Sequence, residues 1–264
     1  TQRALVVESE LTLGLLANYF NVTRGPLQDL RVRQALALAL NRESLIEDAD
    51  RPRLVPAWSW VPDMPGRKGL SLFQEDAVEA RRLLAAAGYP GGKGFPVLRM
   101  SLPLWMEGSI YPAACSERWF QELGIRTYVA YETPAARSVR INAGDYDVVY
   151  GLLVATVPDP ADLLTAFTMP VEYNETKWRD EETVRLLAEA NRRTGAERLA
   201  LLELAERRAM AAVPAVPLMF QRRQTLLSTE VRGWYGDPLG RQSPKRLWLE
   251  SPSAKPARYS QPRT

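Results

Sequence analysis

The sequence has 264 residues, of which 46% are apolar and 25% charged, so its composition is that of a globular chain rather than a disordered one. It contains no histidine and a single cysteine, Cys115, which excludes a Ser-His-Asp triad, a Cys-His pair, a histidine-ligated metal and an internal disulfide. The longest apolar run, Val148 to Ala155, is far shorter than the roughly 20 residues that a membrane-spanning helix needs. No glycine-rich phosphate-binding motif is present, so we expect neither a cofactor nor a metal.

The formal net charge of +3 is concentrated at one end of the chain. Residues 241–264 hold six Lys or Arg and a single Glu, whereas 28 of the 34 basic and 30 of the 31 acidic residues lie outside this segment. The rest of the chain therefore lacks the excess positive charge that follows a phosphate backbone, and we expect no nucleic-acid partner. Residues 251–264, with three prolines and no large aliphatic side chain, are predicted to form a disordered basic tail.

The first part of the chain alternates apolar strands with amphipathic helices. Segment 13–22 predicts a strand, and Asp29 is predicted to cap a helix that reaches Ile46. Residues 50–70 are rich in proline and glycine and predict a loop, in which Trp58 and Trp60 need either the core or a partner to cover them. The elements predicted next are a helix over 75–87, a strand over 96–101, a helix over 110–122, a strand over 125–131, a helix over 133–143 and a strand over 146–154.

The second part begins where Pro158-Asp159-Pro160 interrupts the chain. A helix is predicted from Asp180 to Arg192, and Thr194 with Glu197 has the spacing of a capping box for a helix that extends to Ala212. The many Arg and Glu side chains of 179–208 are interpreted as a solvated helix surface. Two strands, 216–221 and 225–227, follow. Helices that alternate with strands indicate an α/β layer architecture.

Five motifs occur in a fixed order over about residues 13–250. They are YFNVTRGPLQDLRVRQALALALNR at 19–42, PA with VP at 56–62, LLAAAGYPGGKGFP at 83–96, YD with PDP at 146–160, and VPAVPL at 213–218. Together they resemble the extracytoplasmic solute-binding proteins of oligopeptide, dipeptide and nickel ABC importers, which form solute-binding family 5. The resemblance covers the C-terminal half of that family, whose complete members form two lobes that close on a ligand.

The resemblance implies a domain organisation. Residues 1–13 would be a lead-in from a missing first lobe, 14–226 the distal α/β lobe of a periplasmic-binding-protein-like fold, a mixed sheet flanked by helices, and 227–250 a segment that returns to the first lobe. We expect the chain to be a fragment, or one piece of a cleaved or split protein. A periplasmic or other extracytoplasmic location, with a lipid anchor at the absent N-terminus as an option, follows from the same resemblance.

The resemblance also implies where a ligand would bind. In the family, an acidic residue just before the YPDP loop pairs with the α-ammonium of the ligand, and the equivalent residue here is Thr156, whose hydroxyl cannot form that ion pair. Either the ligand lacks a free amino terminus, or it binds differently, or Asp159 or Glu132 supplies the charge. The family's aromatic residue corresponds to Leu153. The residues expected to line the cleft are Thr156, Leu153, Tyr150, Tyr131, Glu132, Arg140, Asn18 and Tyr19.

Some of these residues have a plain structural interpretation as well. Thr156 could be a loop-capping hydroxyl, Leu153 and Tyr150 could belong to the core, and Arg140 could lie with Arg137 on a solvated helix face. Cys115 is interpreted as a small buried hydrophobe.

Three hypotheses for function follow. The first is a non-enzymatic binding module of an ABC importer, which captures peptides or other small solutes and delivers them to membrane permease subunits. The second is a sensor or interaction module that uses the same fold. The third is a hydrolase that would use Asp145 and Asp147 as a carboxylate pair, which requires both to share a cleft.

Overall fold

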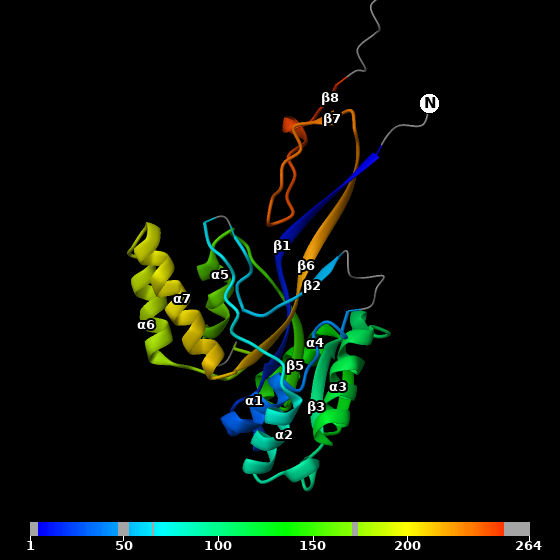
Figure 1. Ribbon diagram of the computed structural model, residues 1–264, viewed down its shortest axis with the longest axis vertical. Coiled ribbons are helices and arrows are strands. Elements are labelled where there is room, and N and C mark those ends of the chain that lie inside the picture. Colours follow the sequence, from blue (N-terminus) through cyan, green and yellow to red (C-terminus); the bar gives the residue numbers. More distant parts are fainter. Residues whose placement is uncertain (1–4, 47–52, 65, 171–173, 251–264) are drawn as a thin grey trace, which may run out of the picture.

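The computed structural model describes residues 5–46, 53–64, 66–170 and 174–250 and is built around a six-stranded mixed sheet (Figure 1). The strand order is β2-β6-β1-β5-β3-β4; β1 is antiparallel to β6 and β5, whereas β3 is parallel to β5 and β4. This confirms the predicted α/β class. The strands of the sheet are β1 (Leu5–Phe20), β2 (Leu54–Pro56), β3 (Leu98–Pro103), β4 (Thr127–Glu132), β5 (Val148–Val154) and β6 (Ala215–Ser228).

Five of the seven described α-helices begin after a residue whose side chain accepts from a free backbone N–H group. Asp29 accepts from the N–H of Arg31, and Thr133 accepts from the N–H of Ala136, both as predicted. The helices are α1 (Leu30–Leu38), α2 (Ala77–Ala86), α3 (Ile110–Leu123), α4 (Pro134–Ala143), α5 (Pro160–Leu164), α6 (Glu181–Ala190) and α7 (Gly195–Ala211). A short 3-10 helix, η3 (Leu104–Met106), joins β3 to α3.

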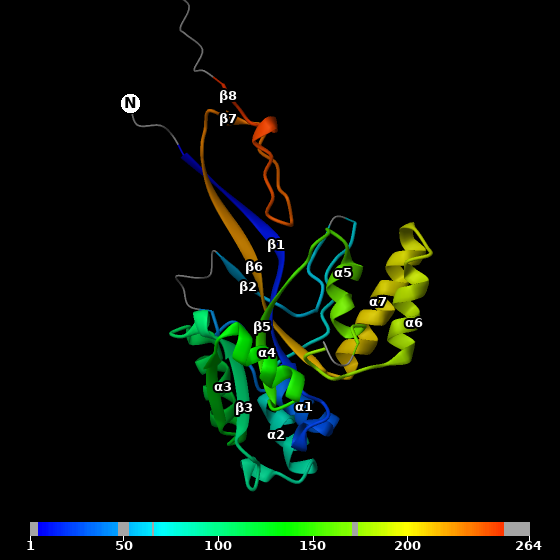
Figure 2. The same cartoon turned by 180° about the vertical axis from the view of Figure 1, so that it is seen from behind.

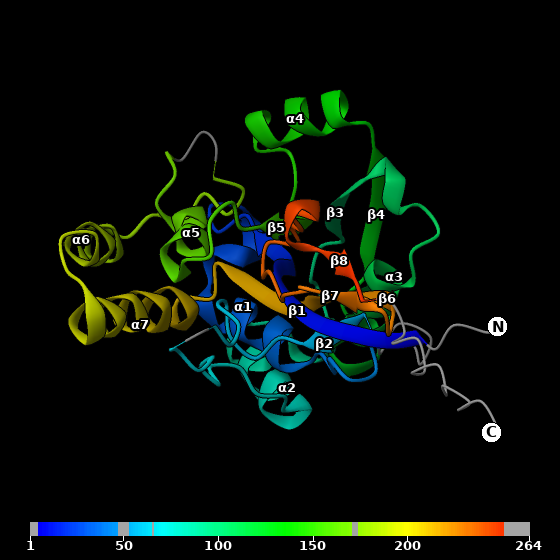
Figure 3. The ribbon, with the colours of Figure 1, turned by 90° about the horizontal axis from the view of Figure 1, so that it is seen from above.

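Helices cover both faces of the sheet. On one face the indole N–H of Trp119 in α3 donates to the carbonyl of Leu36 in α1, and α2 packs against both helices. On the other face the indole N–H of Trp60 donates to the carbonyl of Leu163 in α5, and α5 contacts α7. Seen from above, α5 and α7 lie on one side of β1 and β5 and α3 lies on the other (Figure 3). Figure 2 shows the same two groups of helices from behind.

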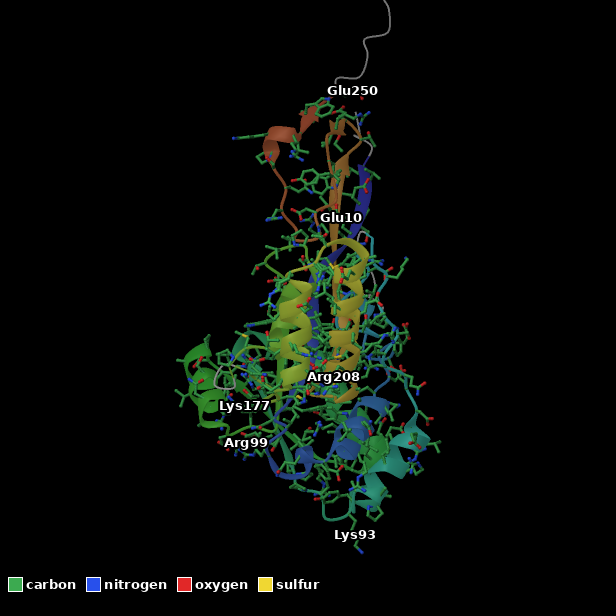
Figure 4. The ribbon with its side chains drawn as sticks, turned by 90° about the vertical axis from the view of Figure 1, so that its left-hand side faces the viewer. Glu10, Lys93, Arg99, Lys177, Arg208 and Glu250 are labelled. Carbon is green, nitrogen blue, oxygen red and sulfur yellow. The ribbon has the colours of Figure 1, made fainter. Side chains whose placement is uncertain are left out.

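The outer parts of β1 and β6 extend beyond the body as a two-stranded arm, residues 5–11 and 222–228 (Figure 1). The small pair β7 (Val231–Arg232) and β8 (Trp248–Leu249) lies at its far end. Glu10 lies partway along the arm, Glu250 at its tip, and Lys93 at the opposite end of the molecule (Figure 4). The arm and the adjoining β8 expose large apolar side chains, among them Leu5, Val7, Leu226, Trp248 and Leu249.

Several predicted elements are corrected. Helix α1 ends at Leu38 rather than Ile46, because Asn41 starts a separate turn by accepting from the N–H of Ser44. The two strands predicted over 216–227 are one strand, β6, since its arginine-rich middle pairs with β1. The predicted loop 50–70 contains the short strand β2. Thr194 forms no side-chain cap at α7, so the predicted capping box is wrong.

The proposed division at residues 13, 226 and 250 stays a prediction. Strand β1 is continuous across the first boundary, and β6 across the second. The predicted disordered tail, 251–264, lies outside the described residues.

Candidate functional site

Strand β5 is paired on both edges at its start and on one edge further along. Its first residues, Val148 and Val149, pair with β1 on one edge and β3 on the other, but β3 pairs with no later residue of β5. The N–H of Asn21 donates to the carbonyl of Asp147 at one end of the β1–β5 ladder, and the N–H of Ala155 donates to the carbonyl of Leu13 at the other. The second half of β5 therefore has one paired and one open edge.

The alternation of an antiparallel ladder decides which backbone groups face that open edge. Odd-numbered residues of β5 direct their N–H and C=O groups toward β1, so Tyr150, Leu152 and Val154 direct theirs away from it. The carbonyl of Tyr150 accepts from a guanidinium nitrogen of Arg137 at 3.3 Å. Apart from β1, no strand in the described part of the chain pairs with Leu152 or Val154, and these two residues are 37% and 54% exposed. This segment presents a short, unpaired backbone edge at the surface.

A hollow of about 310 Å³, called here the Tyr19 hollow, lies beside this edge. It is large enough for a small-molecule group. Its floor is aromatic: Tyr19 packs edge-on against Trp60, with 5.7 Å between ring centroids, and Trp60 packs on Phe167 at 4.6 Å. The hollow is lined by Tyr19, Gly151, Leu152, Leu153, Val154, Thr156, Asp162, Thr165, Ala166, Met169, Asn174 and Glu175.

The floor of the Tyr19 hollow is fixed by a buried carboxylate on α7. One oxygen of Glu206 accepts from the N–H groups of Trp60 and Val61, each at 2.9 Å, and the other oxygen pairs with Arg67. Burial raises the pKa of Glu206, while Arg67 and the two N–H groups favour its ionised form. Of the two alternatives given for Trp60, cover by the core or by a partner, the structure shows cover by the core. It also corrects the interpretation of 179–208, because Glu206 is fully buried.

Two carboxylates line the Tyr19 hollow. Glu175 lies 3.3 Å from Arg137; burial raises the pKa of Glu175, and the guanidinium of Arg137 opposes that rise. Asp162 accepts from the N–H of Thr156 at 2.6 Å and from its hydroxyl at 3.2 Å. Asp162 forms no salt bridge with any residue that the structure describes. The hollow is thus an apolar and aromatic space with negative charge at its rim.

A second hollow of about 440 Å³, called here the arginine groove, lies on the other face of the sheet. Leu16, which lines it, pairs with Leu152 and shares a face with it, whereas Tyr19 and Gly151 belong to the opposite face. The groove is lined by Thr12, Leu16, Arg53, Leu54, Trp105, Met106, Ser109, Tyr111, Gln221, Arg222 and Arg223. Its charged side chains are all arginines, of which Arg223 pairs with Glu10 at 2.8 Å.

The sequence model of the family described as "Bacterial extracellular solute-binding proteins, family 5 Middle" matches residues 1–175. The chain belongs to this family. Family 5 proteins are transport binding proteins rather than enzymes. The family resemblance seen in the motifs is therefore confirmed.

Individual family 5 relatives agree. The chain is 25% identical over 230 residues to the periplasmic murein peptide-binding protein MppA of Escherichia coli, which covers 84% of this chain and 43% of MppA. It is 23% identical over 240 residues to the periplasmic oligopeptide-binding protein OppA of the same organism, covering 87% of this chain and 44% of OppA. The chain thus spans less than half the length of these curated relatives.

Solved family 5 structures share the fold. The unliganded open form of MppA superposes with a TM-score of 0.79 at 24% identity, covering 92% of this chain and 49% of MppA. A dipeptide-binding protein from Pseudoalteromonas sp. SM9913, solved in complex with Met-Leu, gives a TM-score of 0.74 at 22% identity, covering 95% of this chain and 51% of that one. At these identities the likeness concerns the fold.

The structure brings three of the expected family 5 ligand residues together. Thr156, Leu153 and Tyr19 line one hollow, and their contact with a ligand stays a prediction. Tyr150 and Asn18 do not line it, because both side chains are fully buried, on the face of the sheet that α3 covers. Burial raises the pKa of the Tyr150 phenol. At the open edge, only the backbone of Tyr150 is accessible to a partner, and its carbonyl accepts from Arg137.

The remaining expected residues are engaged elsewhere. Glu132 pairs with Arg140 and accepts from the hydroxyl of Ser101, and Tyr131 lies on the edge strand β4, partly buried. Neither Glu132, Arg140 nor Tyr131 lines the Tyr19 hollow or the arginine groove. Asp159 pairs with Arg198 at 2.9 Å and caps α5. The two carboxylates proposed as substitutes for the family's acid therefore already have cationic partners.

The carboxylate pair considered for a hydrolase has structural partners as well. Asp145 pairs with Arg24, Arg99 and Arg140, and Asp147 pairs with Arg24. Neither lines the Tyr19 hollow or the arginine groove. Within the described residues, no helix is long and apolar enough to cross a membrane, and no cluster of His, Cys, Asp or Glu could hold a metal ion.

Three features were not predicted from the sequence: Asp162 in the Tyr19 hollow, Arg137 as a partner of the open edge, and the arginine groove. A signal for Asp162 was present: it lies two residues after the PDP motif, and an aspartate at this distance can reach back to the N–H groups that precede the motif. No signal in the sequence connects Trp105 with Arg222, because Trp105 follows β3 and Arg222 lies on β6, and β1 and β5 separate these two strands in the sheet.

Proposed function

We propose that this chain is the substrate-binding component of an ABC importer, which captures a peptide or peptide-like solute outside the cytoplasmic membrane and delivers it to a membrane permease. The observation that carries the proposal is the open edge of β5 at Leu152 and Val154 beside the Tyr19 hollow. An extended peptide can add to such an edge as a further strand, with affinity from main-chain hydrogen bonds and side chains directed into adjacent hollows. The names of MppA and OppA support a peptide ligand.

We further propose that a second lobe packs against the arm formed by β1 and β6 and closes over the edge of β5. The arm exposes Leu5, Val7 and Leu226, and the adjoining strand β8 exposes Leu249, to between 56% and 66%. Closure of a second lobe would remove water from the open edge and strengthen each polar contact to the ligand. The chain's coverage of about half of its structural neighbours is consistent with such a lobe.

The proposal is tested by calorimetry on protein expressed from the complete gene. A neutral peptide is compared with an analogue in which one central backbone nitrogen is methylated, which removes one donor and blocks pairing at that residue. We expect the methylated peptide whose N–H faces β5 to bind at least tenfold more weakly, because a main-chain hydrogen bond is lost and its acceptor is left unpaired. Equal affinity for every methylated position would contradict binding along β5. Loss of peptide uptake on deletion of the gene would support import, and turnover of the peptide would contradict a binding role.

A further inference from the structure

Asp162 holds an unbalanced negative charge in the Tyr19 hollow. The charged residues that line the hollow are Asp162 and Glu175, and no lysine or arginine lines it. Glu175 pairs with Arg137 at 3.3 Å, whereas Asp162 forms no salt bridge with any residue that the structure describes. Asp159, which begins the same helix, pairs with Arg198 at 2.9 Å. Of these three carboxylates, Asp162 alone is left without a cationic partner.

The hydrogen bonds of Asp162 do not use its full capacity as an acceptor. Its Oδ2 atom accepts from the N–H of Thr156 at 2.6 Å and from the N–H of Val157 at 3.4 Å. Its Oδ1 atom accepts, among the described residues, only from the hydroxyl of Thr156, at 3.3 Å. A carboxylate oxygen has two lone pairs, so Oδ1 can accept from a further donor. The present donors are neutral and an amide oxygen could accept from them as well, so the loop does not require the charge.

The alternation of the sheet decides which residue of an added strand would face the Tyr19 hollow. Leu153 lines the hollow and lies between Leu152 and Val154, whose backbone groups face the open edge. A strand added there, parallel or antiparallel, places one residue opposite Leu153 with its side chain on the same face. Helix α5, which carries Asp162, lies on that side of β1 and β5 (Figure 3). At the next position on this face, opposite Gly151, Arg137 already occupies the adjoining carbonyl.

We infer that the Tyr19 hollow is a subsite for a cationic ligand side chain, that of a lysine or arginine placed opposite Leu153, with Asp162 as its acceptor. The inference rests on the proposed function, because a strand added to β5 is what directs the side chain into the hollow. Val154 and Met169, both exposed apolar residues of the lining, can cover the methylenes of such a side chain. The carboxylate of Asp162 accepts its N–H groups in a charge-assisted hydrogen bond. The subsite does not need a free amino terminus on the ligand.

The experiment uses tetrapeptides and protein from the complete gene, with affinity measured by calorimetry. We expect acetyl-Ala-Lys-Glu-Ala-amide to bind about tenfold more tightly than the same peptide with norleucine for lysine, which lacks only the ammonium group; this is the size expected of a charge-assisted hydrogen bond. The advantage should shrink at high salt. The norleucine peptide with a free amino terminus tests the other source of an ammonium group, and its affinity should not depend on Asp162.

Substitutions separate this inference from its foundation. Asp162→Asn should remove the advantage of lysine over norleucine, while the matched control Glu203→Gln on α7, which removes one negative charge outside the hollow, should keep it. Equal binding of the two blocked peptides, or a lysine advantage that survives Asp162→Asn, overturns the cationic subsite and leaves peptide binding standing. Dependence on Asp162 that appears only with a free amino terminus overturns it as well. Failure of every peptide to bind overturns the proposed function itself, and this inference with it.

Discussion

Glu206 and Asp162 are carboxylates in two regions of the molecule that share one local geometry and differ in burial and in charge pairing. Each accepts hydrogen bonds from two consecutive backbone N–H groups, Glu206 from residues 60 and 61 and Asp162 from residues 156 and 157. Beneath the Tyr19 hollow, Glu206 is fully buried and paired with Arg67. At the rim, Asp162 has no cationic partner among the described residues. We propose that the paired Glu206 stabilises the fold and that the unpaired Asp162 is available to a ligand.

Among substitutions of these carboxylates, Glu206→Ala is expected to lower the free energy of unfolding most. Removal of the carboxylate leaves the Arg67 guanidinium buried without its partner and frees two backbone N–H groups, which costs about 3–5 kcal/mol in the free energy of unfolding. Urea unfolding followed by tryptophan fluorescence measures it. Glu203→Ala on the same helix is the control and should change stability by less than about 0.5 kcal/mol. A loss below about 1 kcal/mol for Glu206→Ala would contradict the structural role assigned to the pair.

Asp180 is an intermediate case, a carboxylate that is paired but close to the surface. It caps α6 and pairs with Arg208, whose hydrogen bond lowers the pKa of Asp180 below its ordinary value of 3.8. Asp180→Ala should cost about 1 kcal/mol at pH 7, mostly through the lost cap. Asp180→Asn keeps a capping oxygen and should cost about 0.5 kcal/mol.

The pH dependence of these variants has a defined sign. Because the folded-state pKa of Asp180 is depressed, its stabilising charge is present above pH 3.8 and is lost as the pH falls through the lower folded-state value. The stability difference between wild type and Asp180→Asn should therefore be constant from pH 7 to about pH 5 and diminish below pH 4. Urea midpoints over this range check it; a difference that grows on acidification would be inconsistent with the ion pair.

The smallest expected effect on stability is that of Asp162→Asn. An asparagine oxygen can still accept from the N–H of Thr156, and no ion pair is lost, so the free energy of unfolding should change by less than about 0.5 kcal/mol. The same variant should lose its preference for a cationic ligand group. Thermal unfolding with and without a lysine-containing peptide separates the two effects. Strong destabilisation of the unliganded protein would assign Asp162 a structural role like that of Glu206.

The sequence predicted most of the fold because local signals were strong. Asp29 caps α1 where the pattern placed it, and Thr133 caps α4 at the first residue of the predicted helix 133–143. The correction of β6 concerns residues whose environment is set by a distant part of the chain. Strand β6 continues through Arg222 and Arg223, polar residues that look like a break, because β1 pairs with them along the arm.

The candidate site was less predictable for the same reason. The family's motif directed attention to Thr156, and the structure places a carboxylate there, but from Asp162 rather than from Asp159 or Glu132. Burial of Tyr150 and Asn18 could not be read from alternation alone, since a strand covered on both faces has no solvent face. Glu206 looked like its neighbours on α7, and only the packing of the Trp60 loop distinguishes it.

A crystal structure of the protein expressed from the complete gene, with acetyl-Ala-Lys-Glu-Ala-amide bound, tests the central claim most directly. The account predicts an extended peptide beside β5, with backbone hydrogen bonds of about 2.7–3.2 Å to the N–H and C=O groups of Leu152 and Val154. A peptide bound elsewhere, with the edge of β5 still unpaired, would contradict it.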